Sequence, residues 1–121
     1  MDMGRDEIRV AGVDDVEAMF HVRAHCSENA ITPDRLAAMG ITPASLRTAL
    51  QAGQLRSWVC QTQGQVVGFC GADAGSGEVT VLAVLAGHER RGIGRALLAQ
   101  ALRFLQAAGC PKIWLAASAD A

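Results

Sequence analysis

Three arginines and two glycines lie within six consecutive positions, and their types and spacing suit them to bind an anion. In order, the segment reads Arg90, Arg91, Gly92, Ile93, Gly94 and Arg95. We expect it to open a helix, where the first backbone N–H groups lack internal partners and the helix dipole adds positive charge. Glycines have no Cβ, so a phosphate could approach this backbone closely. The segment therefore predicts a phosphate site.

The segment has other interpretations. It could be a glycine-rich turn with a solvated basic rim. A Walker A loop is excluded because no Gly-Lys-Ser/Thr run occurs. The dinucleotide fingerprint fits poorly, because Leu97 stands where a third glycine or alanine belongs and only Asp120 is remotely placed as the acidic residue.

The rest of the composition excludes several classes of protein. A chain of 121 residues and 12.7 kDa has the size of one domain, covering residues 1–121. Its net charge of −1 gives no field that would attract nucleic acid or an anionic membrane. No run reaches ~18 apolar residues, so we expect no membrane span. Residues 1–7 are polar and lack a signal-peptide core, which predicts a cytoplasmic protein.

Four cysteines are scattered along the chain, at Cys26, Cys60, Cys70 and Cys110. They form no C-x-x-C pair, and no histidine stands at metal-ligand spacing from them. We interpret them as reduced, mostly buried thiols and expect neither a disulfide nor a metal site.

The elements that must position the phosphate site are a strand and the helix after it. Residues 78–85 give the strongest strand signal, residues 86–91 form a loop, and a helix is expected over residues 92–108. The wide apolar face of that helix comprises Ile93, Ala96, Leu97, Ala101, Phe104, Leu105 and Ala108. A further strand is expected at residues 112–116.

Earlier segments supply the other expected elements. Residues 7–11 read as a strand, and Asp14 with Glu17 has the form of a capping box. The following helix, to about Cys26, would bury Val16, Met19, Phe20 and Ala24. Two Thr-Pro pairs should begin short helices, the first ending at Gly40, and residues 55–61 and 65–74 read as a hairpin. The Thr-Pro pairs are Thr32-Pro33 and Thr42-Pro43.

Residues 84–98 resemble motif A of the GNAT family of N-acetyltransferases, V-x-x-x-x-Q/R-x-x-G-x-G/A. Val84, Gly92 and Gly94 match the motif, whereas Glu89 stands at the Q/R position. The expected order of elements also matches over nearly the whole chain. The resemblance implies an α/β (α+β) fold with a mixed, mostly antiparallel sheet, a splayed parallel strand pair and flanking helices.

The same resemblance implies acetyl-coenzyme A (acetyl-CoA) as the cofactor. In the family it lies between the two splayed strands, here those around Val84 and Trp114. The backbone of Leu82, Ala83 and Val84 would hold the pantetheine arm, and the Val84 N–H would face the thioester oxygen as charge develops on it. The segment from Arg90 to Arg95 would wrap the pyrophosphate.

Two further roles are implied for side chains. Glu78 stands fourteen positions before Gly92, as the general-base glutamate of histone-type members does. It could also be a solvated carboxylate at a strand end. Ribosomal-protein-type members use an acidic residue on the next strand, where this chain has Ala116. His25 and Glu28 lie in the segment that builds the acceptor pocket in the family, so we expect them to contact the substrate.

The resemblance is incomplete at the C-terminal end. The family fold continues with a helix and two strands, which usually supply a tyrosine acid and an asparagine near the cofactor, whereas here only residues 117–121 follow and no tyrosine occurs. We therefore expect a fold truncated after the fifth strand. Residues 112–116 would form an apolar sheet edge, so we expect a homodimer or a partner chain to cover it.

These observations predict an N-acetyltransferase that transfers an acetyl group from acetyl-CoA to a primary amine of a small molecule or peptide. The alternatives are an impaired relative that still binds coenzyme A (CoA), or an interaction module that uses the open sheet edge.

Overall fold

The computed structural model describes residues 6–27, 29–53, 55–89 and 91–115. In chain order its elements are β1 (Glu7–Val10), a 3-10 turn η1 (Val13–Asp15), α1 (Val16–His25), α2 (Pro33–Ala38), α3 (Pro43–Ala52), β2 (Leu55–Thr62), β3 (Gln65–Asp73), β4 (Glu78–Val84), α4 (Ile93–Ala107) and β5 (Trp114–Leu115). The last strand is shorter than the expected 112–116, because Lys112 and Ile113 precede it, and Ala116 lies outside the described residues.

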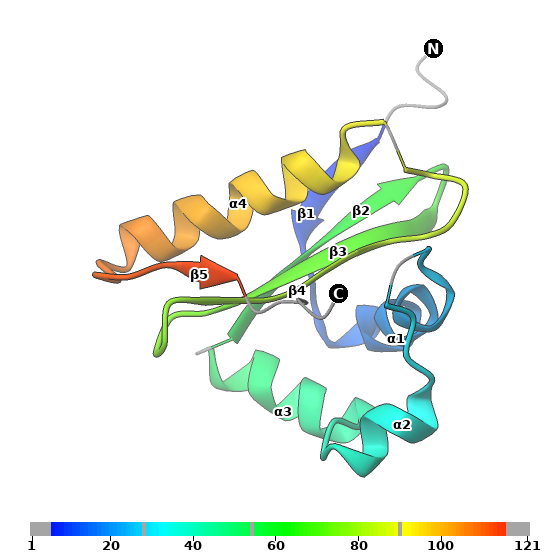
Figure 1. Ribbon diagram of the computed structural model, residues 1–121, viewed down its shortest axis with the longest axis horizontal. Helices are drawn as coiled ribbons and strands as arrows, with labels where there is room; N and C mark the ends of the chain where they lie inside the picture. The colour runs from blue at the N-terminus through cyan, green and yellow to red at the C-terminus, as the bar shows by residue number, and fades with distance from the viewer. Residues whose placement is uncertain (1–5, 28, 54, 90, 116–121) are drawn as a thin grey trace.

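The five strands form one mixed sheet in the order β1-β2-β3-β4-β5. The first four pair antiparallel, and β5 pairs parallel to β4, with Trp114 opposite Glu78 and Leu115 opposite Val79. Helix α4 covers one face of the sheet, and α1 and α3 pack against the other (Figure 1). The predicted fold class, a mostly antiparallel sheet with one parallel pair, is confirmed.

Local signals in the sequence determine several element boundaries. The hydroxyl of Thr32 accepts a hydrogen bond from the Arg35 N–H at 3.2 Å, and that of Thr42 accepts one from the Ser45 N–H at 3.1 Å. Each threonine precedes a proline at the first helical position, where no N–H is needed. The predicted starts of α2 and α3 are therefore confirmed.

The start of α1 differs from the prediction. The carboxylate of Asp15, not Asp14, caps the chain by accepting a hydrogen bond from the Gly12 N–H at 2.8 Å. The same carboxylate binds the Arg9 guanidinium through two hydrogen bonds of 2.9 Å. The predicted Asp14–Glu17 box is wrong because Arg9, on the neighbouring strand, draws Asp15 into the cap and a 3-10 turn precedes the helix.

Helix α1 is buried on two sides rather than along one stripe. Val16 and Phe20 pack with Leu36 of α2, whereas Met19 and Val22 join the core under the sheet. The expectation for Val16, Met19 and Phe20 is confirmed, but Ala24 is only half-buried and Val22 was missed. A helix between a sheet and two other helices needs a wider apolar surface than a single stripe provides.

The main core lies between the sheet and α4. The helix buries Ile93, Leu97, Ala101 and Leu105 against the strands. All four cysteines are among the described residues, and none forms a disulfide. Burial raises the pKa of the Cys70 thiol to about 12, so this thiol stays protonated.

Two kinds of feature are absent from the described residues. No helix there is both long enough and apolar enough to cross a membrane. Nor do any three or more histidine, cysteine or acidic side chains there come together in a way that could hold a metal ion.

Candidate functional site

One edge of β4 is open beyond its first two residues. The Leu85 N–H donates to the Val67 carbonyl of β3 at 2.8 Å. Because successive N–H groups of a strand point to opposite edges, the N–H groups of Val84 and Leu82 point away from β3. In the described part of the chain, β5 pairs with β4 only at Glu78 and Val79. Two backbone N–H groups of β4 therefore face an edge that no described strand covers between Val79 and the bridge from Cys26 to Leu85.

A β-bulge bends β4 where this open edge begins. Gly71 of β3 lies opposite Val81, and Ala72 lies opposite Val79, so Thr80 has no counterpart. The extra residue breaks the alternation of side chains, and both Thr80 and Val81 face the pocket described below.

The predicted phosphate turn joins the end of β4 to α4 (Figure 1). Gly92 is the N-cap of α4 with φ of +80°, and a Cβ added there would meet no atom within 4 Å. The first helical hydrogen bond runs from the Ala96 N–H to the Gly92 carbonyl at 3.0 Å. The N–H groups of residues 93–95 therefore lack helical acceptors at an exposed turn. This backbone is open to an incoming anion.

The arginine side chains around the turn differ in whether other residues already bind them. Arg91 forms an ion pair with Asp6 at 2.7 Å and a hydrogen bond with the His88 ring at 3.0 Å. Arg95 is exposed, and Arg90 lies outside the described residues. The Glu89 carboxylate accepts a hydrogen bond from the Gly87 N–H at 2.9 Å, so the residue that departs from the motif holds the loop's own backbone.

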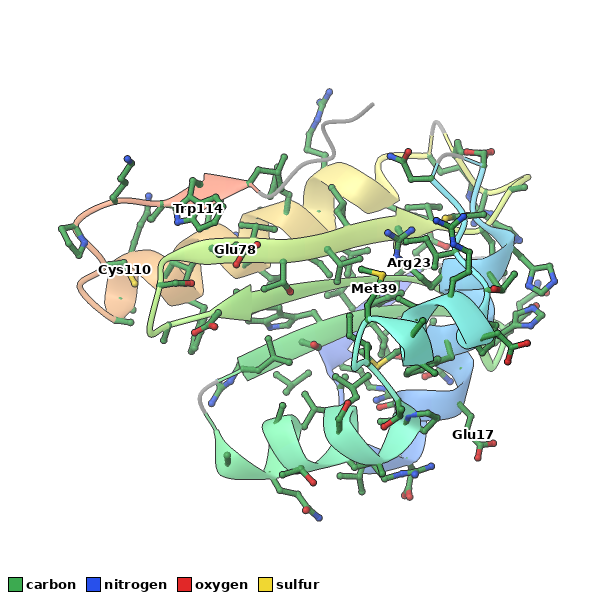
Figure 2. All side chains as sticks on the ribbon, turned by 60° about the horizontal axis from the view of Figure 1, so that its bottom comes forward. Glu17, Arg23, Met39, Glu78, Cys110 and Trp114 are labelled. Carbon is green, nitrogen blue, oxygen red and sulfur yellow. The ribbon has the colours of Figure 1, made fainter. Side chains whose placement is uncertain are left out.

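Glu78 lies at the start of β4 on the face of the sheet that carries the pocket. It stands opposite Asp73 of β3, which lines the pocket, and directly opposed side chains share one face. Figure 2 shows Glu78 close to Trp114, its counterpart on β5. Glu78 itself does not line the pocket.

His25 is near the open edge through its backbone rather than its ring. Its carbonyl accepts a hydrogen bond from the Ala86 N–H at 3.2 Å, next to a bridge between Cys26 and Leu85. Its exposed ring stacks on His21 at 4.3 Å between centroids and does not line the pocket. The second predicted substrate residue, Glu28, lies outside the described residues.

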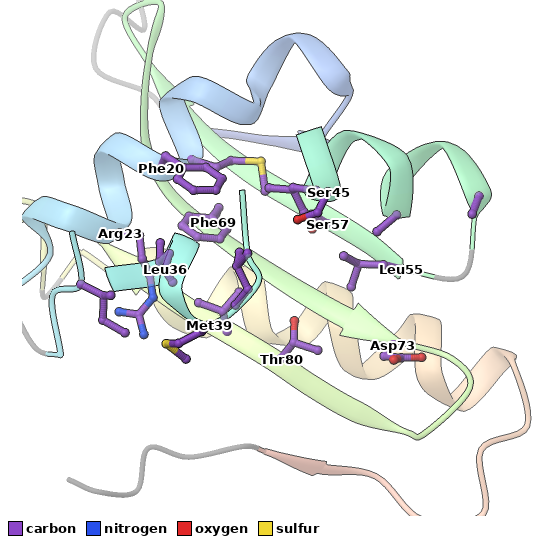
Figure 3. Close-up of a pocket in the computed structure, with 17 residues that line it drawn as sticks. Phe20, Arg23, Leu36, Met39, Ser45, Leu55, Ser57, Phe69, Asp73 and Thr80 are labelled. Atoms are coloured by element: carbon purple, nitrogen blue, oxygen red, sulfur yellow. The ribbon is translucent and has the colours of Figure 1, made fainter. Parts of the chain in front are cut away.

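A pocket of about 630 Å³ lies between helices α1–α3 and the sheet (Figure 3). Most of its lining is apolar, including Phe20, Leu36, Met39, Leu46, Leu55 and Phe69. The polar side chains that line it are Arg23, Ser45, Ser57, Asp73 and Thr80.

Sequence reasoning missed Arg23, which lies at the α1 side of this pocket. The available signal was its spacing: Arg23 stands one helical turn after Phe20, which packs into the core, so both share a face of α1.

The structure combines a mixed sheet with a bulged strand that has an open edge and leads into an exposed glycine turn. An extended ligand that ends in phosphates is the kind of molecule that such a site can bind. The chain matches the Acetyltransferase (GNAT) family over residues 17–121. It belongs to the GNAT acetyltransferase family. A comparison with curated proteins found no match.

Solved structures share the fold at low sequence identity. PaiA N-acetyltransferase from Thermoplasma acidophilum, in complex with coenzyme A, is 16% identical, with a TM-score of 0.71 over 87% of this chain and 74% of that one. An aminoglycoside N-acetyltransferase, AAC(6')-Iy with CoA, is 20% identical, with a TM-score of 0.71 over 97% and 80%. A ribosomal-protein-alanine N-acetyltransferase from Brucella melitensis is 17% identical, with a TM-score of 0.62 over 95% and 82%.

Proposed function

We propose that this protein transfers an acetyl group from acetyl-CoA to a primary amine of a small molecule or peptide. The observation that carries the proposal is the open edge of β4 running into the exposed turn at Gly92. An extended pantetheine arm can pair with such an edge as a strand would. The pyrophosphate would then meet the first N–H groups of α4.

The proposed reaction is direct attack of the amine on the thioester. A C–N bond forms as the C–S bond breaks, the amine loses a proton, and CoA departs as its thiolate. The Val84 N–H, which points to the open edge, would donate to the thioester oxygen as it gains negative charge, and the backbone of Leu82 and Val84 would hold the arm. The predicted contact through Ala83 does not fit this arrangement, because the Ala83 backbone faces β3. A fixed donor of this kind is worth ~3 kcal/mol in the transition state.

Glu78 is proposed as the base that removes the amine proton, because most of a primary amine is protonated at neutral pH. It lies six residues, or ~20 Å, along β4 from Val84, so the proton would reach it through a chain of water molecules. The chain has no tyrosine to act as an acid. A CoA thiol, with a pKa near ~8.5, is a fair leaving group without one. His25 and Glu28 stay proposed acceptor contacts, and residues 90–95 the proposed pyrophosphate site.

Calorimetry and a thiol-release assay test this function together. Acetyl-CoA should bind in a one-to-one complex, and free thiol should appear only when a suitable amine is added. Binding without thiol release from any member of a broad amine panel would favour a CoA-binding relative that lacks catalysis. No heat of binding would reject both and favour an interaction module.

A further inference from the structure

Among the described residues that line the pocket beside β4, Arg23 is the one cation, and most of the other side chains are apolar. Its side chain lies beside Met39 in the whole-molecule view and in the close-up of the pocket (Figures 2 and 3). One guanidinium nitrogen, Nη1, donates to the Asn29 carbonyl and to the Cys26 Sγ at 3.8 Å, and among the described residues no carboxylate forms an ion pair with Arg23. A guanidinium has five N–H donors in a planar fork that matches a carboxylate. Arg23 therefore has donors available for an anionic group inside the pocket.

The pocket also reaches the strand where the acetyl group would lie. Thr80 and Val81 both line it, because the bulge turns two consecutive side chains of β4 to the same face. A Cβ added to Gly71 would lie 2.7 Å from the Thr80 hydroxyl and 3.3 Å from the Ser57 hydroxyl. The glycine leaves room for these two hydroxyls to converge beside β4, where the partly exposed Thr80 hydroxyl can bind an acceptor's polar group and the buried Ser57 lies beneath it.

The walls between these polar groups would accept an apolar side chain. Leu36, Phe69 and Leu46 come from α2, β3 and α3, and the volume of about 630 Å³ suits a small ligand. A polyamine would leave this apolar surface unfilled and bring a positive charge close to Arg23. The Arg23 end of the pocket thus disfavours a second positive charge, whereas the Asp73 carboxylate at the other end could hold one ammonium group (Figure 3).

We propose that the acceptor is an apolar α-amino acid. Its carboxylate pairs with Arg23, its side chain fills the pocket, and its α-amine passes Thr80 and Val81 and points along β4 toward the open edge at Leu82 and Val84. This inference rests on the proposed acetyl transfer: the α-nitrogen bonds to the acetyl carbon, its proton passes to a base, and CoA leaves as thiolate.

A matched series of acceptors tests the carboxylate. With acetyl-CoA, L-phenylalanine should be acetylated, whereas 2-phenylethylamine and L-phenylalaninamide, which lack the carboxylate, should lose about 10- to 100-fold in kcat/KM. Spermidine should be a poorer acceptor still. Equal or better turnover of 2-phenylethylamine would overturn the proposal while leaving acetyl transfer intact.

Substitutions of Arg23 test the residue. R23Q should raise KM for L-phenylalanine about 10- to 100-fold but leave KM for 2-phenylethylamine nearly unchanged, and R23K should fall between. R47Q is the matched control, because Arg47 pairs with exposed Glu17 at 3.6 Å, outside the pocket. Equal KM changes for both acceptors would count against Arg23 as the carboxylate partner.

A substitution in the apolar wall tests whether the side chain of the acceptor amino acid enters the pocket. Ala49 of α3 lines the pocket, so A49F should reduce turnover of L-phenylalanine relative to L-alanine. An unchanged ratio would show that the side chain does not enter this pocket.

A binding measurement separates this inference from the proposed function. Calorimetry with L-phenylalanine, in the presence of CoA, should show binding that R23Q abolishes and that R47Q retains. If this holds although no acetylation occurs, the amino-acid site stands and the transferase proposal fails. If acetyl-CoA binds and other amines are acetylated while L-phenylalanine neither binds nor reacts, the amino-acid proposal fails alone.

Discussion

At the scale of single residues, the carboxylate of Glu78 is the group whose removal should affect turnover most. E78Q keeps the size of the side chain but cannot accept the amine proton, so kcat should fall about 10²- to 10⁴-fold. Acetyl-CoA affinity should stay within about twofold, because Glu78 stands at the far end of β4 from the Gly92 turn. Steady-state kinetics and calorimetry measure the two effects.

Glu17 offers the matched control for E78Q. Its side chain is 84% exposed on α1 and pairs only loosely with Arg47 at 3.6 Å, so E17Q should leave kcat unchanged. Full activity of E78Q would mean that this carboxylate is a solvated strand end and that another group takes the proton.

The sequence predicted site residues well where their roles depend on neighbours along the chain. Gly92 stands at the turn because its place between a strand and an amphipathic helix is a local property. Arg91 and Arg23 were harder, because their surroundings depend on distant segments. The ion pair of Arg91 with Asp6 spans 85 positions, and the pocket beside Arg23 needs α2, α3 and three strands. Neither the ion pair nor the pocket produces a repeating pattern or a fixed spacing of residues along the chain.

At the scale of elements, the start of α4 should bind phosphate through its backbone, and Gly92 tests this. An alanine at φ of +80° is strained by roughly 1–2 kcal/mol, but its Cβ would meet no protein atom within 4 Å. G92A should therefore stay folded, and it should weaken acetyl-CoA binding at least tenfold because the methyl group occupies space that the phosphate needs. Calorimetry and thermal unfolding report the two quantities.

Gly109 at the other end of α4 provides the control. It has the same φ of +80°, and a Cβ there also meets nothing within 4 Å. G109A should lower thermal stability about as much as G92A while acetyl-CoA affinity stays unchanged. Similar affinity losses in both variants would assign the effect to backbone strain rather than to a phosphate contact.

The cap before α1 should make stability depend on pH. The guanidinium of Arg9 holds the pKa of Asp15 below its usual value, so the carboxylate is charged in the folded state at pH 7. This stabilisation is complete above the ordinary pKa of aspartate, ~3.9, and is lost as pH falls toward the lowered folded value. D15A should lower the free energy of unfolding at pH 7 by about 1–2 kcal/mol, because it removes the cap and the ion pair.

Urea unfolding at several pH values measures this difference. The gap between wild type and D15A should shrink steadily as pH drops below about 4, since the wild-type carboxylate is then progressively protonated. D14A, which alters the exposed neighbour that the sequence singled out as the cap, should unfold like wild type at every pH. A pH-independent gap for D15A would assign its effect to packing.

At the scale of the whole molecule, the order of the elements and the pairing of the strands follow from local sequence patterns. The hairpin turn at Gln63 and Gly64, with φ of 52° and 80°, brings two strand-forming segments into antiparallel contact. The apolar face of α4 packs on the sheet, so the chain crosses over through this helix and β5 lies parallel to β4. The pocket could not be predicted, because its walls come from six elements, α1–α3 and β2–β4, and local sequence patterns do not determine the angles at which these elements pack.

Strand β5, at one edge of the described sheet, is the place where we expect a second chain to bind. Trp114 is 44% exposed and Leu115 is 55% exposed on β5, and an apolar edge strand is a template for pairing. We expect a homodimer or partner chain to cover this edge.

Light scattering should detect dimers whose fraction rises with concentration, and L115D should shift the equilibrium to monomer. In a W58F background, which leaves Trp114 as the only tryptophan, emission should shift to the blue on association. If the protein stays monomeric at 100 μM, roughly a hundred times a micromolar Kd, and Trp114 remains accessible to a quencher, this edge is not a self-association surface.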